Sequence, residues 1–188
     1  MLFRSVSHSP KQVEYVEWKY KLLEPIKACR IYPVTQYHKV RKKEYTTLQF
    51  CTQALSYFTR LRNLFYPQGK KIVLRSLLNK LTPLGLAVWF MDDGTSFKNN
   101  KGYPQLNLST CGYTFEENEI IKRYFKEVWD IDVRVHKRKN YPHIYINKPN
   151  ALKLIEIIKD HIIPSMLYKI KFFVQTSPYP QLAVEDIV

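Results

Sequence analysis

Residues 82–94 read Thr82-Pro83-Leu84-Gly85-Leu86-Ala87-Val88-Trp89-Phe90-Met91-Asp92-Asp93-Gly94. Threonine favours a helix N-cap and proline suits the first helical position, so this stretch predicts a helix over residues 83–93. Residues 84–91 are apolar, and we expect the helix to be buried on every side. Its last two residues are carboxylates at the negative pole of the helix dipole, which destabilise the helix unless a cation or a proton compensates. Asp92 is equally compatible with a solvated Asp-Gly turn, whereas Asp93 is a candidate ligand for a divalent cation.

Two parts of the sequence follow the same pattern. Capping-box signatures occur at Ser9-Pro10-Lys11-Gln12 and at Thr114-Phe115-Glu116-Glu117, 105 residues apart, and each opens an amphipathic helix. An alternating hairpin follows each helix, and a further helix ends each copy. The repeat of strand, helix, hairpin and helix predicts a pseudo-twofold protein in which each half presents its sheet to a shared ligand. The hairpins are expected at residues 29–35 with 45–51 and at 131–137 with 141–147, and Pro67 and Pro164 stop the last helices.

The segment Leu86-Ala87-Val88-Trp89-Phe90-Met91-Asp92-Asp93-Gly94 resembles the nine-residue signature of the LAGLIDADG homing endonucleases. Residues 7–19 and 163–169 resemble the opening and closing segments of that family, so the likeness covers residues 1–171. The fold that it implies is α+β, with two pseudo-twofold related αββα halves whose antiparallel sheets form a saddle for nucleic acid. The resemblance divides the chain into three parts. These are a first repeat without a signature helix (1–80), a second repeat with the signature-like helix 83–93 (81–171), and a C-terminal extension (172–188).

The resemblance also implies a site and a function. In that family the last acidic residue of each signature helix binds divalent metal beside the scissile phosphates, and this role falls to Asp93 with the carbonyl of Gly94. Mg²⁺ or another divalent cation there would polarise a phosphoryl oxygen and lower the pKa of the attacking water. The family's active-site lysine is matched by Lys71 and Lys169, each of which would orient water or neutralise developing charge. The implied function is a site-specific, intron-homing endonuclease that cuts both strands of DNA across the minor groove.

One part of the family pattern is missing from this sequence. Double-copy members carry two signature helices, and the 105-residue repeat places the first one before Met1, so one catalytic aspartate stands where two are expected. Three interpretations follow: another polypeptide supplies the missing helix, the endonuclease has decayed, or the protein is retained for binding. The alternative function is a non-cleaving RNA-binding protein, either a group I intron maturase or a domesticated ribonucleoprotein component. Its 14 tyrosines and 10 phenylalanines would offer stacking surfaces for unpaired bases.

Strand alternation predicts which side chains face nucleic acid. In the second repeat, apolar residues alternate with the long polar side chains that read base edges in a major groove. The tip of the first hairpin carries four basic residues suited to phosphate contacts, and we call these four the basic turn. A solvated polar face explains the alternation but not its richness in Arg, Gln and Asn. The base-reading set is Gln105, Asn107, Ser109, Arg134, His136, Arg138, His143 and Tyr145, and the basic turn is Lys39, Arg41, Lys42 and Lys43.

The charge of the chain favours a nucleic-acid partner. The sequence holds 30 Lys+Arg and 16 Asp+Glu, a net charge of +14, of which +12 falls within residues 1–80. A basic surface that serves only solubility is the alternative. His136 and His143 flank Asn140, but no ββα-metal framework of a His-Asn-His nuclease surrounds them, and the sequence has neither a glycine-rich phosphate loop nor a nucleophilic triad.

Cysteine usage and hydropathy indicate where in the cell the protein is located. The three cysteines are far apart and form no C-x-x-C pair, which favours a reducing compartment over a disulfide framework or a zinc site. No apolar run reaches the roughly 18 residues of a membrane span, and residues 1–9 lack a signal-peptide core. We expect an intracellular protein without a membrane partner, in an organelle (mitochondrion or chloroplast) or in a bacterial or phage-infected cytoplasm.

Overall fold

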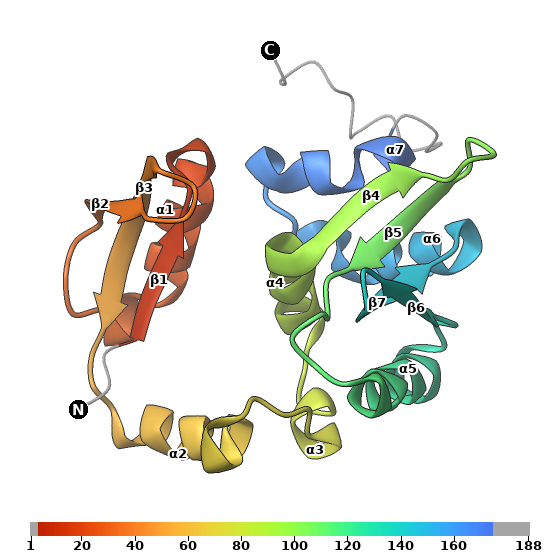
Figure 1. Cartoon of the computed structure of the whole chain (residues 1–188), viewed down its shortest axis with the longest axis horizontal. Helices are drawn as coiled ribbons and strands as arrows, with labels where there is room; N and C mark the ends of the chain where they lie inside the picture. The colour runs from red at the N-terminus through yellow and green to blue at the C-terminus, as the bar shows by residue number, and fades with distance from the viewer. Residues whose placement is uncertain (1–3, 175–188) are drawn as a thin grey trace. The chain divides into compact units, whose positions relative to one another are not determined.

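The computed structural model describes residues 4–174 of the chain. Internal contacts divide the chain into unit 1, residues 1–64, and unit 2, residues 65–188 (Figure 1). The division at residue 80 predicted from the sequence follows the repeat rather than the packing, and it stays a prediction. None of the helices between residues 4 and 174 is long and apolar enough to cross a membrane.

Unit 1 contains a three-stranded antiparallel sheet in the order β1-β3-β2. Helix α1 packs on β1 and β3 and buries Tyr15, Val16 and Phe50 completely. The predicted capping box at Ser9 takes another form, because Pro10–Gln12 forms a 3-10 turn and the Ser9 hydroxyl accepts from the amide of Lys11 at 3.4 Å. The regular elements are β1 (Arg4–His8), α1 (Val13–Leu22), β2 (Tyr32–His38), β3 (Lys43–Thr52) and α2 (Ser56–Phe65), whose last residue belongs to unit 2.

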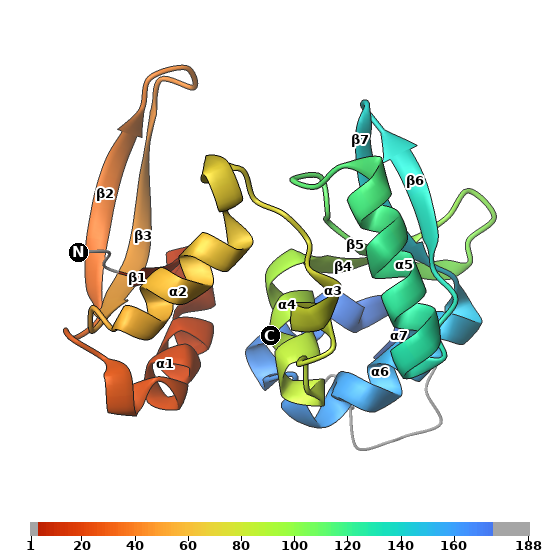
Figure 2. The ribbon, with the colours of Figure 1, turned by 90° about the horizontal axis from the view of Figure 1, so that it is seen from below.

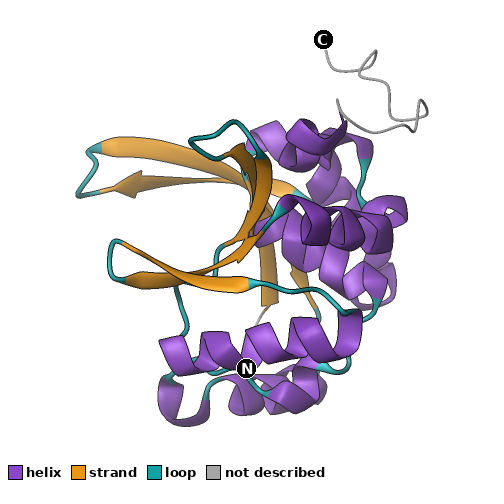
Figure 3. Ribbon diagram, turned by 90° about the vertical axis from the view of Figure 1, so that its right-hand side faces the viewer, coloured by secondary structure: helices purple, strands orange, loops and turns teal. Residues whose placement is uncertain are grey.

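Unit 2 contains a four-stranded antiparallel sheet in the order β4-β5-β7-β6, with its helices on one face (Figure 3). Leu106, Leu108, Ile144 and Ile146 point toward these helices and are buried. The remaining elements of unit 2 are α3 (Arg75–Leu78), α4 (Pro83–Asp93), β4 (Gly94–Lys98), β5 (Pro104–Leu108), α5 (Phe115–Trp129), β6 (Arg134–Arg138), β7 (Tyr141–Ile146), α6 (Lys148–Ile158) and α7 (Lys171–Val174). Short 3-10 turns lie at Pro67–Gly69, Lys159–His161 and Pro164–Ile170.

The two units confirm the predicted repeat of strand, helix, hairpin and helix. The series β1-α1-β2-β3-α2 in unit 1 corresponds to β5-α5-β6-β7-α6 in unit 2, and the sheet orders β1-β3-β2 and β5-β7-β6 agree. Both predicted hairpins form, and Figure 2 shows each as a two-stranded ribbon closed by a turn. The predicted capping box at Thr114 is complete, with the Thr114 hydroxyl and the Glu117 carboxylate each accepting the other's amide. Over residues 4–64, α4 and β4 have no counterpart.

Helix α4 covers the predicted residues 83–93, but its predicted burial on every side is wrong in part. Contacts with α6 and with the turn Lys159–His161 bury one side of α4, whereas Leu84, Val88 and Trp89 remain partly exposed. Within the predicted C-terminal extension, Phe173 of α7 is 2% exposed and belongs to the core. The rest of the predicted extension, residues 175–188, lies outside the described residues.

Candidate active site and nucleic-acid interface

The end of α4 presents two carboxylates directly before β4. At the other end of the helix the Thr82 hydroxyl accepts the amide of Gly85 at 3.2 Å, as the sequence predicts. Gly94 is the C-cap, and a Cβ there would collide with the ring and the carbonyl oxygen of Phe90. Only glycine therefore allows the chain to turn from helix to strand this tightly. The Asp93 carbonyl accepts the amide of Ser109 at 3.0 Å, which ties the junction to the end of β5.

Lys169 supplies a cation at this helix end. Its ammonium group donates to the Gly94 carbonyl at 2.8 Å and to the Asp92 carbonyl at 3.4 Å. A positive group at the negative pole of α4 is the compensation that the sequence requires for the paired carboxylates. Burial lowers the pKa of Lys169, and the charges of Asp92 and Asp93 oppose this shift in part.

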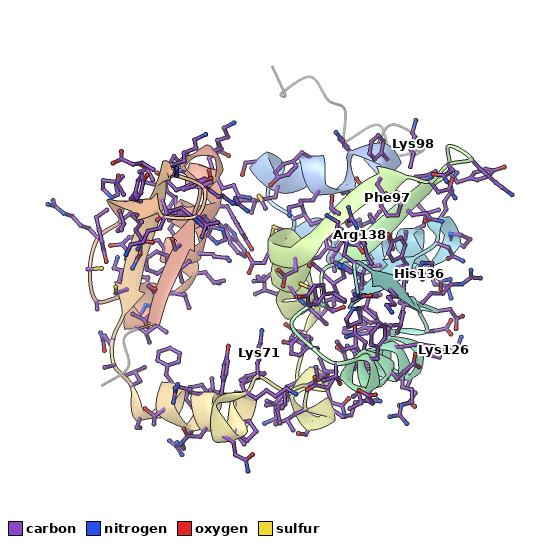
Figure 4. The ribbon with its side chains drawn as sticks, in the orientation of Figure 1. Lys71, Phe97, Lys98, Lys126, His136 and Arg138 are labelled. Atoms are coloured by element: carbon purple, nitrogen blue, oxygen red, sulfur yellow. The ribbon has the colours of Figure 1, made fainter. Side chains whose placement is uncertain are left out.

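Lys71 approaches Asp93 from the loop before α3, from which its side chain extends in Figure 4. Its ammonium group lies 4.9 Å from the centre of the Tyr113 ring. Partial burial pulls the pKa of Lys71 down, but its interaction with Tyr113 and the charges of Tyr66 and Asp93 outweigh that effect and leave the pKa above its usual value. Lys71 and Asp93 line the same cavity of about 220 Å³, which apolar side chains otherwise dominate. The structure thus brings Asp93, Lys71 and Lys169 together at one end of α4.

The donor set at this point suits a divalent cation bound partly through substrate. Within residues 4–174, no group of three or more His, Cys, Asp and Glu side chains could enclose a metal ion. Mg²⁺ commonly takes one or two carboxylates and completes its shell with phosphate oxygens and water. Asp93, which is exposed, and the Gly94 carbonyl fit that mode. Because Lys169 already donates to this carbonyl, a cation would share the oxygen with the lysine or displace it.

The helix-free face of the unit 2 sheet carries most of the predicted base-reading residues. Strand register places Phe97 opposite Gln105, Asn107 opposite Tyr145, and Tyr145 opposite Arg134 on one face. The same register adds three pairs of neighbours to that face: Thr95 with Asn107, His136 with His143, and Arg138 with Tyr141.

An aromatic cluster crosses this face. The rings of His136 and Tyr145 stack with centres 4.3 Å apart, and Phe97 meets Tyr145 edge-on at 5.4 Å. Figure 4 shows Phe97 and His136 on β4 and β6. This cluster places three rings among the polar side chains of the face. Asn107, by contrast, is only 8% exposed, and Ser109 lies beyond the end of β5.

His143 differs from the exposed members of the predicted set. Burial, together with the nearby charge of Arg138, lowers the pKa of His143. Its Nδ1 atom is buried and has no hydrogen-bond partner. Both effects disfavour the charged form of the His143 ring.

The basic turn lies at the tip of the unit 1 hairpin, as predicted. Lys39, Arg41 and Lys42 form the turn between β2 and β3, Lys43 is the first residue of β3, and all four are exposed. Register also identifies residues that the sequence analysis missed: Tyr32, Gln36, His38, Tyr45 and Gln49 share the face that continues from Lys43. Their signal was the alternation within residues 32–38 and 43–49. In unit 2, β4 with Phe97 was missed, because its five residues give too short a periodic pattern.

Comparison with known proteins agrees with the resemblance found in the sequence. Residues 3–154 match the LAGLIDADG DNA endonuclease family. A probable intron-encoded endonuclease of Wickerhamomyces canadensis is 35% identical over 118 residues, 61% of this chain and 51% of that protein. The cytochrome b mRNA maturase bI2 of Debaryomyces hansenii is 31% identical over 134 residues, 70% of this chain and 48% of that protein. The chain spans about half the length of these two relatives.

A solved structure also has a fold similar to that of this chain. The homing endonuclease I-WcaI, bound to its DNA recognition sequence, superposes with a TM-score of 0.79 and 25% identity, over 89% of this chain and 74% of that one. The family match covers more than three quarters of the chain and includes both Lys71 and Asp93. The chain belongs to the LAGLIDADG DNA endonuclease family.

Proposed function

We propose that this chain provides the site-specific, metal-dependent DNA-cleaving activity of an intron-homing endonuclease. The observation that carries the proposal is the convergence of Asp93, Lys71 and Lys169 at the C-terminal end of α4. Family membership supports it, as does the likeness to an endonuclease that was solved with its DNA recognition sequence. A carboxylate between two ammonium groups is suited to a phosphodiester, because it leaves positive charge available for the phosphate.

The metal is assigned to the exposed carboxylate of Asp93 and the Gly94 carbonyl. When bound there, Mg²⁺ or another divalent cation would polarise a phosphoryl oxygen and favour ionisation of the attacking water. Lys71, which lines the same cavity as Asp93, neutralises charge that develops on the phosphate. Lys169 holds the Asp92 and Gly94 carbonyls and so keeps the helix end in place.

The two sheets are assigned to DNA binding. On unit 2, Gln105, Arg134, His136, Arg138 and Tyr145 read base edges from the exposed face. On unit 1, the basic turn contacts phosphates, which sets the register of the protein on the duplex without reading its sequence. We propose an intracellular, reducing compartment for this activity, with an organelle or a bacterial or phage-infected cell as its setting.

Cleavage of both strands requires a second acidic group beside the second scissile phosphate. We propose that another polypeptide supplies it, which is one of the three interpretations that the sequence leaves open. The products of cleavage distinguish the possibilities: linear DNA indicates two working sites in the assembly, whereas nicked DNA indicates one. Nicked or linear DNA supports the assignment of Asp93 to the metal site if formation of that product requires Asp93.

The test is cleavage of a supercoiled plasmid library that carries candidate intron-insertion sites, with Mg²⁺ or with EDTA. We expect wild-type protein to give nicked or linear product only with Mg²⁺, and Asp93→Asn to reduce that product at least about 100-fold, the usual order for loss of a key transition-state group. Asp92→Asn is the matched control, since it removes the same charge one residue away, and a reduction below about fivefold is expected. Equal losses in the two variants would contradict the assignment of Asp93.

The similarity to a maturase supports one other function, binding of a structured intron RNA without cleavage. It predicts that DNA stays intact in every reaction, while the protein binds a group I intron transcript in a salt-dependent manner. That result would replace the endonuclease proposal.

A further inference from the structure

Lys71 lies in a loop that gives its side chain no support from regular secondary structure. Residues 70–74 form neither helix nor strand. Two backbone amides of this loop nevertheless have defined partners: Ile72 donates to the carbonyl of Phe65 at 2.8 Å, and Val73 donates to the carboxylate of Glu117 at 3.0 Å. The second bond joins the loop to a residue 44 positions later in the sequence.

The Glu117 carboxylate holds two segments at once. Its Oε1 accepts the amide of Val73, and its Oε2 accepts the amide of Thr114 at 2.7 Å. The second contact is the capping box of α5, where a negative charge also interacts favourably with the helix dipole. One side chain therefore fixes the Lys71 loop to the first turn of α5.

Tyr113 lies directly before the N-cap residue of α5, and the Lys71 ammonium group is 4.9 Å from the centre of its ring. The turn is well anchored, because Tyr113 donates its amide to the Thr110 carbonyl at 3.1 Å and the Thr110 hydroxyl donates to buried Asn118 at 2.5 Å. Thr110 and Asn118 are at most 1% exposed. The backbone that carries the Tyr113 ring is thus held in place.

We propose that Glu117 and Tyr113 are positioning residues for Lys71, Glu117 through the backbone of Val73 and Tyr113 through contact with the ammonium group. This inference rests on the proposed function, in which Lys71 acts on the phosphate. A lysine on an unsupported loop samples many rotamers, and a displacement of about 1 Å costs a catalytic group about 100-fold in rate. The two contacts together fix where the loop runs and where the amine sits, beside the cavity that Asp93 lines.

The first test compares Glu117→Ala with Thr114→Ala. Both variants remove half of the capping box, but only Glu117→Ala also releases Val73, so it should lower the midpoint of thermal unfolding somewhat more than Thr114→Ala. In single-turnover cleavage with protein in excess, we expect Glu117→Ala to slow the reaction about 10- to 100-fold, with the Kd for DNA changed less than twofold. Thr114→Ala should slow it less than threefold. Equal slowing by the two variants would reduce Glu117 to a structural cap and overturn the proposal.

Conservative variants guard against a failure to fold. Glu117→Gln keeps one carbonyl acceptor, and Tyr113→Phe keeps the ring beside the amine while losing the hydroxyl that hydrogen-bonds to Lys71. Both variants should therefore retain more activity than Glu117→Ala and Tyr113→Leu. In a Lys71→Met background, Glu117→Ala should slow cleavage by less than twofold, because the residue to be positioned is gone. A full additional loss in that background would show that Glu117 acts elsewhere.

A second measurement works without DNA or metal. Brief acetylation followed by peptide mass spectrometry reports the reactivity of the Lys71 amine, with its neighbour Lys70 as internal reference. We expect Tyr113→Leu and Glu117→Ala to raise the Lys71 to Lys70 ratio at least threefold, and Thr114→Ala to leave it unchanged. If wild-type protein cleaves nothing while this ratio rises as expected, the positioning stands and the proposed endonuclease function fails. If cleavage occurs but the ratio does not change, the positioning inference fails.

Discussion

Replacement of Lys169 by methionine tests whether a cation stabilises the C-terminal end of α4. Methionine keeps the length and the apolar stem of the side chain but leaves the Gly94 and Asp92 carbonyls without the ammonium donor. A charged hydrogen bond contributes about 1.5–3 kcal/mol, and a cation at a helix C-terminus about 0.3–1 kcal/mol. Lys169 is half-buried, so water replaces part of the interaction and the desolvation of the ammonium already offsets some of it.

We therefore expect Lys169→Met to lower the free energy of unfolding by about 1–2 kcal/mol, which corresponds to a fall in Tm of about 2–8 °C for a chain of this size. Urea unfolding followed by circular dichroism and tryptophan fluorescence measures it, and Trp89 and Trp129 report on unit 2. Lys171→Met is the matched control, because that exposed amine lies over the Phe172 ring at 5.1 Å. It should change stability by less than about 0.5 kcal/mol. Equal effects of the two substitutions would refute the role of Lys169 at the helix end.

Three further predictions follow from the same structure. Gly94→Ala should destabilise unit 2 by about 1–3 kcal/mol in urea unfolding, since the new Cβ meets the backbone of Phe90; an unchanged midpoint would contradict this. Neutralising any one residue of the basic turn should reduce the slope of log Kd against log salt for duplex DNA by about one, and an unchanged slope would remove that residue from the phosphate contacts. Lys153 and Lys126 lower the pKa of Asp130 from 3.8 to about 2, so ionised Asp130 stabilises the fold above pH 4 and this contribution is lost as the pH falls toward 2. Asp130→Asn should therefore be less stable than wild type at pH 6 but equal to it near pH 2; a difference independent of pH would exclude the charge as its cause.

Sequence alone predicted α4 to the residue because each of its boundaries has a local chemical cause. Thr82 caps the first turn, Pro83 fits the first helical position, and Gly94 permits the close approach that ends the helix. The repeat was predictable for a related reason, since a capping box followed by alternating hairpin residues is a pattern contained within about 40 positions. Local signals of this kind do not depend on how distant segments pack.

Several unpredicted features depend on contacts between distant residues. Strand β4 gains its identity from pairing with β5 rather than from its own sequence. The capping box at residues 114–117 was predicted, but the second bond of Glu117 to Val73 was not, because it crosses 44 positions and leaves no mark in either segment. The partial exposure of α4 is another such feature, because hydropathy reports how apolar a helix is and not how many neighbours surround it.

The two lysines that the sequence presents as equivalents occupy different environments. Lys169 commits its ammonium group to two main-chain carbonyls, and burial lowers its pKa. The Lys71 amine rests on an aromatic ring beside the cavity, and its pKa is raised. A group that must meet an incoming phosphate needs an uncommitted donor, whereas a group that holds a helix end needs its donors occupied. The repeat explains why both lysines lie near Asp93, and from their contacts we propose that Lys71, whose amine interacts with the side chain of Tyr113, acts on the phosphate and that Lys169 supports the helix end.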